Sequence, residues 1–364
     1  MGRRRWLFGE MGIKSTPGYM SPKRILSLDA LRIVAAFSIV MQHVGGQFLP
    51  MSFPSAEWEI RNIYISVAQW GVAVFFMISG ALFLSPDKPL IIRRLFGKNL
   101  LRIVYAFLFW SAIYILVTEG LGQGLKIYFL SVLKGPPHFW FLTVMIGIYL
   151  TLPALKGIAG QEKAFSYLVG LAIVTTFVIP SVFSHLELFN PLRKQALADY
   201  YDGYGLTSLY FITYFILGHW LFSHTISSRM RKIIYLLAAL SIVASALATR
   251  WLSYRLGFCH SFFYEDLHPF VLIQGVAVFV FFKERFRVLS SQASRIVLNL
   301  SNYSFGIYLV HPLMIYLCTN FLGFNSSTFP VVWFGPVYSV FIFILSFLLV
   351  KLISMIPFMR KFVM

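Results

Sequence analysis

Residues 28–46 read LDALRIVAAFSIVMQHVGG, an apolar stretch long enough to cross a lipid bilayer as a helix. It nevertheless carries Asp29, Arg32 and His43, three ionisable side chains that are costly to place in hydrocarbon. Such side chains normally face the interior of a helix bundle or a water-filled cavity. The stretch therefore predicts a membrane helix that turns a polar face toward a functional site.

The rest of the sequence has the composition of a multi-pass membrane protein. Of its 364 residues, 58% are hydrophobic and 12% are charged, whereas soluble domains carry about 25% charged residues. The apolar runs are long and continuous, which favours helices over the short alternating strands of a barrel. We predict an all-α, polytopic helical membrane protein with about ten transmembrane helices. The predicted spans cover residues 26–46, 64–84, 100–118, 138–155, 165–184, 207–223, 233–250, 267–283, 297–320 and 331–357.

The positive charges indicate the orientation of the chain. Most of the 31 Lys and Arg lie in the N-terminal segment, in every second loop and at the C-terminus, so both termini are predicted to be cytoplasmic. This distribution is not the basic stripe of a nucleic-acid-binding domain, and no nucleic-acid partner is expected. We divide the chain into a cytoplasmic N-terminal tail at 1–24, a transmembrane domain at 25–358 and a cytoplasmic C-terminal tail at 359–364. Two cysteines, Cys259 and Cys318, exclude a disulfide framework, and no metal site is expected.

Arg32 and His43 share one face of the first helix. They are eleven residues apart, which is close to a whole number of turns, so both side chains project in one direction about 16 Å apart along the axis. Asp29 lies one turn before Arg32 and can pair with it. Two plainer roles stay open. The Asp29–Arg32 pair could staple neighbouring helices, and a neutral His43 could form a single interhelical hydrogen bond.

The first helix also resembles that of a known family. Residues 24–43, RILSLDALRIVAAFSIVMQH, are similar to the first helix of the acyltransferase-3 family of membrane acyltransferases, whose signature is a basic residue, ten others and then His. Arg32 and His43 fit that spacing. Four more segments resemble the family in the same order: WGVAVFFMISGALFL at 70–84, RRLFGKNLLRI at 93–103, HFWFLTVMIGIYL at 138–150 and SNYSFGIYLVHPLMI at 301–315.

Two features differ from the pattern of this family. The basic cytoplasmic loop of the family often carries paired arginines three residues apart, and here Asn99 occupies the first of those positions, before Arg102. Some members append a periplasmic esterase-like domain, which we do not expect in a sequence that ends at Met364. Acyl transfer is then expected to finish within the membrane domain or at its outer loops.

The resemblance implies an enzyme that moves an acyl group, usually acetyl, from cytoplasmic acyl-CoA to a glycan hydroxyl. We expect an O-acetyltransferase of the bacterial cytoplasmic (inner) membrane that acts on a cell-surface or exported polysaccharide or on its lipid-linked oligosaccharide precursor. Acyl-CoA is then a donor substrate, and no bound cofactor is expected. Membrane lipids and polysaccharide assembly machinery are the other expected partners.

The resemblance and the chemistry of acyl transfer together suggest roles for individual residues. His43 is the expected catalytic residue, either as general base or as the group that accepts the acyl chain. Arg32 would orient the donor or neutralise developing charge, and Asp29 would hold Arg32 in place. The candidates for donor binding are cations of the cytoplasmic loop, although ordinary positive-inside charges would look the same: Arg102, Lys98, Arg93 and Arg94. The candidates for acceptor binding lie on two later helices: His138, Trp140, Ser301, Tyr303 and His311.

Several of these features have simpler explanations. Trp140 could belong to an interfacial aromatic belt, and His311 could merely satisfy the backbone carbonyl that Pro312 frees. Gly80 is expected to allow close helix packing. The outer loop at 185–205, HLELFNPLRKQALADYYDGYG, would suit a sugar or be an ordinary solvated loop.

Two other functions were weighed against acyl transfer. A transporter or flippase for a polar or glycolipid substrate is the alternative, because ten helices with buried charges would serve it equally well. Transporters often show two related halves, and no such symmetry is visible in the sequence. A receptor or assembly scaffold explains the buried charges least well.

Overall fold

A computed structural model describes residues 24–48, 53–86, 88–120, 122, 124–182, 207–286, 289–324 and 331–363. These residues form helices and connecting segments, with no strand among them. The helices are α1 Leu26–Phe48, α2 Ala56–Ala68, α3 Gly71–Phe83, α4 Ile92–Arg94, η1 Leu95–Leu100, α5 Leu101–Thr118, α6 Leu125–Lys134, η2 Pro137–Phe139, α7 Trp140–Ala159, α8 Glu162–Ile173, η3 Val174–Val178, α11 Thr207–Ser223, α12 Ser228–Leu256, η5 Phe262–Tyr264, α13 Pro269–Arg285, α14 Ser291–Leu322, α15 Val331–Ser354 and η6 Met359–Phe362.

The helices confirm an all-α, polytopic membrane protein. In the described part of the chain, nine helical stretches of 18 residues or more are apolar enough to cross a membrane. With 17 residues, α11 is just shorter than this, although it contains no Asp, Glu, Lys or Arg. Most of the predicted N-terminal tail and the polar stretch at 185–205 lie outside the described residues.

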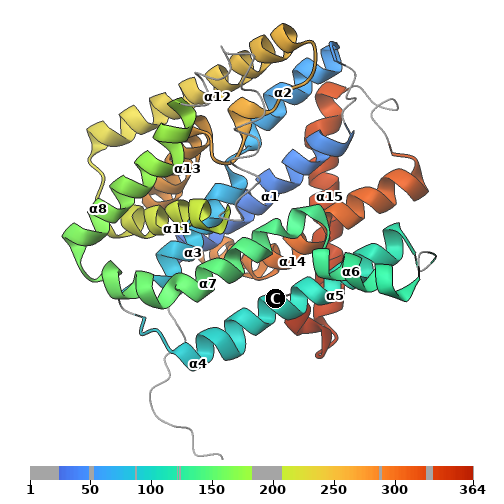
Figure 1. Cartoon of the computed structure of the whole chain (residues 1–364), viewed down its shortest axis with the longest axis horizontal. Coiled ribbons are helices and arrows are strands. Elements are labelled where there is room, and N and C mark those ends of the chain that lie inside the picture. The colour runs from blue at the N-terminus through green and yellow to red at the C-terminus, as the bar shows by residue number, and fades with distance from the viewer. Residues whose placement is uncertain are drawn as a thin grey trace, which may run out of the picture.

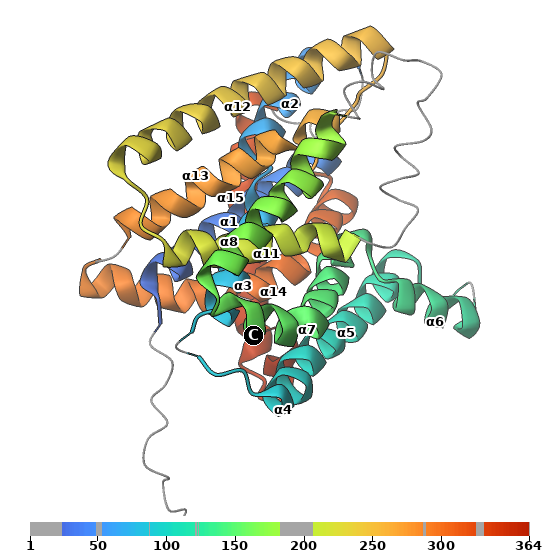
Figure 2. The same ribbon diagram turned by 60° about the vertical axis from the view of Figure 1, so that its left-hand side comes forward.

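The helices enclose a buried centre made of α1, α3 and α14. In both views α12 and α5 lie on opposite sides of the molecule with these three helices between them (Figures 1 and 2). The first helix, the α2–α3 stretch and α14 bury most of their residues, whereas the stretches that contain α8, α12 and α15 bury less than a third of theirs. In a bilayer the exposed apolar side chains of these outer helices would face lipid. The charged helix α1 is therefore shielded from lipid by its neighbours.

Two glycines bring α3 and α11 into backbone contact. A Cβ atom added to Gly80 would lie 1.6 Å from the carbonyl oxygen of Phe215, and one added to Gly218 would lie 2.1 Å from that of Met77. Only residues without a side chain allow this approach, as in other closely packed membrane helices. The expected packing role of Gly80 is confirmed.

The predicted span at 64–84 differs from the structure because the helix is interrupted. Its two parts, α2 and α3, meet at Gln69 and Trp70, inside a stretch that is long enough to cross the membrane. The carbonyl of Ala68, at the break, accepts hydrogen bonds from the side chains of Ser38 and Gln42 on α1. Interrupted helices are tolerated within membranes where protein groups satisfy the freed backbone. The side chains of α1 thus stabilise the break.

Both described ends of the chain pack on the same part of α14. Arg24 donates to the side chain of Asn302 at 2.9 Å. At the other end, the carbonyl oxygen of Val363 would lie 2.7 Å from a Cβ added to Gly306. The predicted C-terminal tail includes η6, whose Phe362 is buried and stacks on α5. The two ends therefore lie on one side of the bundle.

Candidate active site

Helices α1 and α14 contact each other at two levels, and each level contains predicted site residues. At the first level, the hydroxyl of Ser301 donates to Oδ1 of Asp29 at 2.9 Å. About four turns further along α1, the rings of His43 and His311 lie 4.9 Å apart between centroids. These contacts align the two helices so that the face carrying Asp29, Arg32 and His43 meets α14.

Asp29 forms the centre of a polar network at the first level. Its Oδ1 atom accepts hydrogen bonds from Arg24 at 3.1 Å and from Ser301, and it lies 3.7 Å from Nη1 of Arg32. The carboxylate is buried, and a buried charge needs such partners to be stable. Asp29 therefore holds Arg24 more closely than Arg32. Ser301, predicted to bind the acceptor, lies in this network rather than beside His43.

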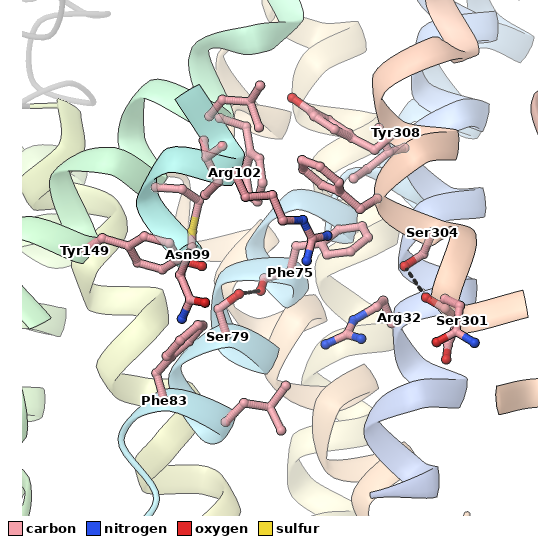
Figure 3. A pocket seen from close by; sticks show the side chains of 18 of the residues that line it. Arg32, Phe75, Ser79, Phe83, Asn99, Arg102, Tyr149, Ser301, Ser304 and Tyr308 are labelled. Atoms are coloured by element: carbon pink, nitrogen blue, oxygen red, sulfur yellow. Dashed lines mark hydrogen bonds between the residues drawn. The ribbon is translucent and has the colours of Figure 1, made fainter. Parts of the chain in front are cut away.

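A cavity of about 440 Å³ opens beside this network. Arg32 and Arg102 extend their guanidinium groups into it from α1 and α5 (Figure 3). Arg24 and Asn302 line it as well, close to the Asp29 network. The other lining residues are mostly apolar or aromatic: Ile39, Phe75, Ser79, Leu82, Phe83, Asn99, Ile103, Phe141, Leu142, Met145, Tyr149, Ser301, Ser304, Phe305 and Tyr308.

The charge and shape of the cavity suit an anionic ligand with an apolar portion. Among the described residues that line it, three carry a guanidinium group and none is acidic. The guanidinium of Arg102 lies 5.3 Å from the centre of the Phe305 ring, which supports the cation from one side. Arginine is well suited to phosphate because its planar group donates two parallel hydrogen bonds. The aromatic walls offer contacts for the uncharged part of such a ligand.

The other predicted donor-binding cations lie outside the cavity. Arg93, Arg94 and Lys98 are exposed, and none of them lines it. Asn99, which replaces a basic residue of the family pattern, does line it. It belongs to η1, a short π-helical segment that leads into α5, and π-helical segments are frequent at functional sites.

Three histidines gather at the second level. His43 from α1, His138 from η2 and His311 from α14 have ring centroids 4.9 to 6.2 Å apart. His138 and His311 are buried and His43 is half-buried. In the described chain, Nε2 of His138 and Nε2 of His311 have no hydrogen-bond partner. Within those same ranges, no group of three or more His, Cys, Asp or Glu is arranged to hold a metal ion.

Tyr308 joins the cavity to the histidine cluster. It lines the cavity, and its hydroxyl donates a hydrogen bond to the backbone carbonyl of His138. Its ring lies 6.0 Å from the rings of both His138 and His311. A ligand that fills the cavity would therefore end one side chain away from the three histidines.

The remaining acceptor-binding candidates have aromatic neighbours. Trp140 packs its ring 4.8 Å from that of Phe211 on α11. Tyr303 packs against Phe347 of α15 with centroids 5.4 Å apart. Neither residue lines the cavity.

Four residues near the site had no predicted role. Tyr149 lines the cavity from α7, and the Tyr114 hydroxyl reaches the backbone of α14 beside His311. Gln69, at the helix break, donates to Asp266 at 3.3 Å, so a carboxylate lies beside the interruption. Of these four residues, only Asp266 could have been singled out from the sequence, because it is an acidic residue just before an apolar run. The two tyrosines look like any other aromatic residues of a membrane span.

The comparison with known families agrees with this geometry. Residues 25–351 match the sequence profile of the acyltransferase-3 family, described as an acyltransferase domain. No significant match was found among curated proteins or among solved structures. The match covers most of the chain, including Arg32, Arg102 and all three histidines, and it begins one residue after Arg24. The chain therefore belongs to the acyltransferase-3 family and is a multi-pass membrane acyltransferase.

Proposed function

We propose that this enzyme transfers an acetyl or other acyl group from cytoplasmic acyl-CoA to a hydroxyl of a cell-surface or exported polysaccharide, or of its lipid-linked precursor. The observation that carries the proposal is that Tyr308, which lines the arginine-lined cavity, also packs against two rings of the histidine cluster. One region can hold an anionic donor while the other removes a proton. We place the enzyme in the cytoplasmic membrane of a bacterium, with both termini in the cytoplasm, because the positive charges are distributed accordingly.

The cavity supports acyl-CoA as the donor. Coenzyme A carries several phosphate charges at one end and a long, mostly uncharged arm that ends in the thioester. Arg24, Arg32 and Arg102 would bind the phosphates, and the apolar walls would guide the arm toward Tyr308. Burial strengthens each charge interaction, since water screens it less. Lys98, Arg93 and Arg94 remain predicted donor contacts at the cytoplasmic side.

His43 would take part directly in the chemistry, because it is the histidine of the cluster with exposed surface. As general base, its ring takes the proton of the acceptor hydroxyl while the hydroxyl oxygen bonds to the thioester carbonyl carbon. The carbon–sulfur bond then breaks, and the proton passes to the departing CoA thiolate.

As acyl acceptor, the same ring nitrogen bonds to the carbonyl carbon and CoA leaves as thiolate. The acceptor hydroxyl then displaces the ring from the acyl group, and its proton passes to the thiolate. Incubation with labelled acyl-CoA alone separates these two roles, because a labelled enzyme forms only in the second.

The acceptor is proposed to approach the histidines from the side opposite to the donor. His138, Trp140, Tyr303 and His311 remain the predicted contacts for its sugar rings and hydroxyls. Ser301 also remains a candidate, although its contact with Asp29 places it nearer to the donor.

The test uses membrane vesicles that contain the enzyme and the polysaccharide of its host. Vesicles supplied with [14C]acetyl-CoA on the cytoplasmic face should incorporate label into polysaccharide, as an ester that mild alkali releases. His43→Ala should lower the rate of incorporation by about 1000-fold. Arg102→Ala should raise the KM for acetyl-CoA by about 10- to 100-fold, which is 1.4 to 2.8 kcal/mol of lost binding. Arg229→Ala, an exposed arginine at the start of α12, is the matched control and should behave like wild type.

Two results would overturn the proposal. Unchanged incorporation in the His43 variant would remove the histidine cluster from the reaction. Loss of polysaccharide export, with esterification of the remaining material intact, would favour the alternative of a transporter.

A further inference from the structure

The course of α14 is altered beside His311. Pro312 has no N–H, so the carbonyl of Tyr308, four residues earlier, has no backbone partner within the helix. One residue further on, the hydroxyl of Tyr114 accepts from the N–H of Leu313 at 3.0 Å and donates to the carbonyl of Leu309 at 2.9 Å. In an uninterrupted helix these two backbone groups would bond to each other. A side chain from α5 therefore bridges them.

The freed carbonyl determines which nitrogen of His311 carries the proton. Nδ1 of His311 lies 2.8 Å from the carbonyl oxygen of Tyr308 and 3.2 Å from that of Ile307. A carbonyl oxygen can only accept, so Nδ1 must be the donor. In the neutral ring Nε2 is then an acceptor without a proton. His311 has no exposed surface, and its Nε2 has no hydrogen-bond partner among the described residues.

Among the described residues, the rings that pack against His311 belong to two histidines and one tyrosine. His43 is nearest by ring centroid, at 4.9 Å and in an edge-on arrangement. The rings of His138 and Tyr308 lie 5.9 and 6.0 Å away. His43 is half-buried and has one N–H when neutral, so it is the neighbour that can both donate to His311 and reach a substrate.

We propose that His311 is a positioning residue for His43: its Nε2 accepts the N–H of the His43 ring and leaves the other ring nitrogen of His43 free for the substrates. This proposal rests on the proposed acyl transfer, and it holds for either role of His43, because both roles need the unprotonated nitrogen. Pro312 and Tyr114 contribute indirectly by keeping the Tyr308 carbonyl available to Nδ1 of His311. In the same way, the base that activates a nucleophile in other enzymes is often oriented by a third group. Here His43 would be the reactive group and His311 the group that orients it.

The central experiment compares substitutions at position 311 in the full-length enzyme in vesicles. The oxygen of a glutamine side chain can reach the place of Nε2, whereas that of an asparagine reaches only the place of Nδ1. His311→Gln should therefore keep at least tenfold more kcat than His311→Asn. His311→Leu should lower kcat about 100- to 1000-fold. The KM for acetyl-CoA should stay within about threefold in all three variants, because His311 does not line the donor cavity.

A double variant tests whether His311 acts through His43. If it does, His43→Ala combined with His311→Leu should be no slower than His43→Ala alone. The matched control is His219→Leu on α11, which removes a buried histidine packed 5.3 Å from the ring of Phe165. This control should keep kcat within about threefold, which separates the predicted effect from a general cost of burying leucine.

Two outcomes would overturn the proposal: equal activity of the Gln and Asn variants, or losses that multiply in the double variant. Since Gln and Asn are both polar, their comparison remains informative even if the Leu variant does not fold. Absence of acyl transfer by the wild-type enzyme would instead overturn the proposed function. Loss of activity in His43→Ala with full activity in all His311 variants would overturn only the present inference.

Discussion

Replacing Gly80 with alanine should destabilise the protein by separating α3 from α11. The added Cβ atom would lie 1.6 Å from the Phe215 carbonyl oxygen, and ordinary van der Waals contact begins near 3.4 Å. The helices would have to move apart by about 1.8 Å at this point, the difference of these two distances. The obstacle is backbone rather than the end of a flexible side chain, so a rotamer change cannot relieve it.

The expected cost follows from two opposing effects. Alanine favours a helix over glycine by about 1 kcal/mol, whereas overpacking a tight contact costs about 1 to 3 kcal/mol or more. Because the clash involves backbone, we expect a net loss of about 2 kcal/mol or more, or a fall in apparent Tm on the order of 3 °C. The shift would also move Phe75, Ser79 and Phe83, which line the cavity from α3. The KM for acyl-CoA should therefore rise as well.

The assay is thermal unfolding of the purified protein in detergent, followed by size-exclusion chromatography. Gly170→Ala is the matched control, because this exposed glycine of α8 has open space around its missing Cβ. It should leave Tm unchanged or raise it. Gly218→Ala, on the other side of the same contact, should lower Tm as Gly80→Ala does. A Gly80→Ala protein that melts at or above the wild-type temperature would refute the close approach of α3 and α11.

Three further predictions concern the donor site and the C-terminal contact. Raising the salt concentration from 50 to 500 mM should increase the KM for acetyl-CoA several-fold, because salt screens the charges, and this increase should be smaller in Arg102→Ala. An equal increase in the wild type and in Arg102→Ala would argue against a contact between Arg102 and phosphate. Asp29→Asn should raise the KM for acetyl-CoA about tenfold by weakening the polar network, whereas Ser301→Ala, which removes one hydrogen bond, should change this KM at most threefold. Both values come from steady-state kinetics in vesicles, and a larger effect of Ser301→Ala than of Asp29→Asn would contradict the prediction. Trp110→Phe removes the indole hydrogen bond to the Phe362 carbonyl and should lower stability by about 1 kcal/mol without changing KM, so a changed KM would place the C-terminal segment in donor binding.

The membrane spans could be predicted from the sequence because insertion depends mainly on local composition. A continuous apolar stretch of about 20 residues satisfies both the bilayer and its own backbone. The predicted span at 26–46 accordingly coincides with the apolar stretch Leu26–Gly46 of α1. The interruption between α2 and α3 could not be predicted in this way, because it depends on Ser38 and Gln42 of another helix, which bond to the carbonyl of Ala68.

The alignment of Arg32 with His43 was likewise predictable, since the helical repeat is a property of one helix and needs no neighbour. Their surroundings were decided only by tertiary structure. The packing of α1 on α14 brings Ser301 to Asp29 and His311 to His43, and η2 adds His138. No local sequence pattern predicts these contacts, because they depend on which helix faces pack together and at what depth in the bundle. The sequence by itself therefore determined a membrane protein with a charged first helix, and the packing of distant helices decided what that charged face meets.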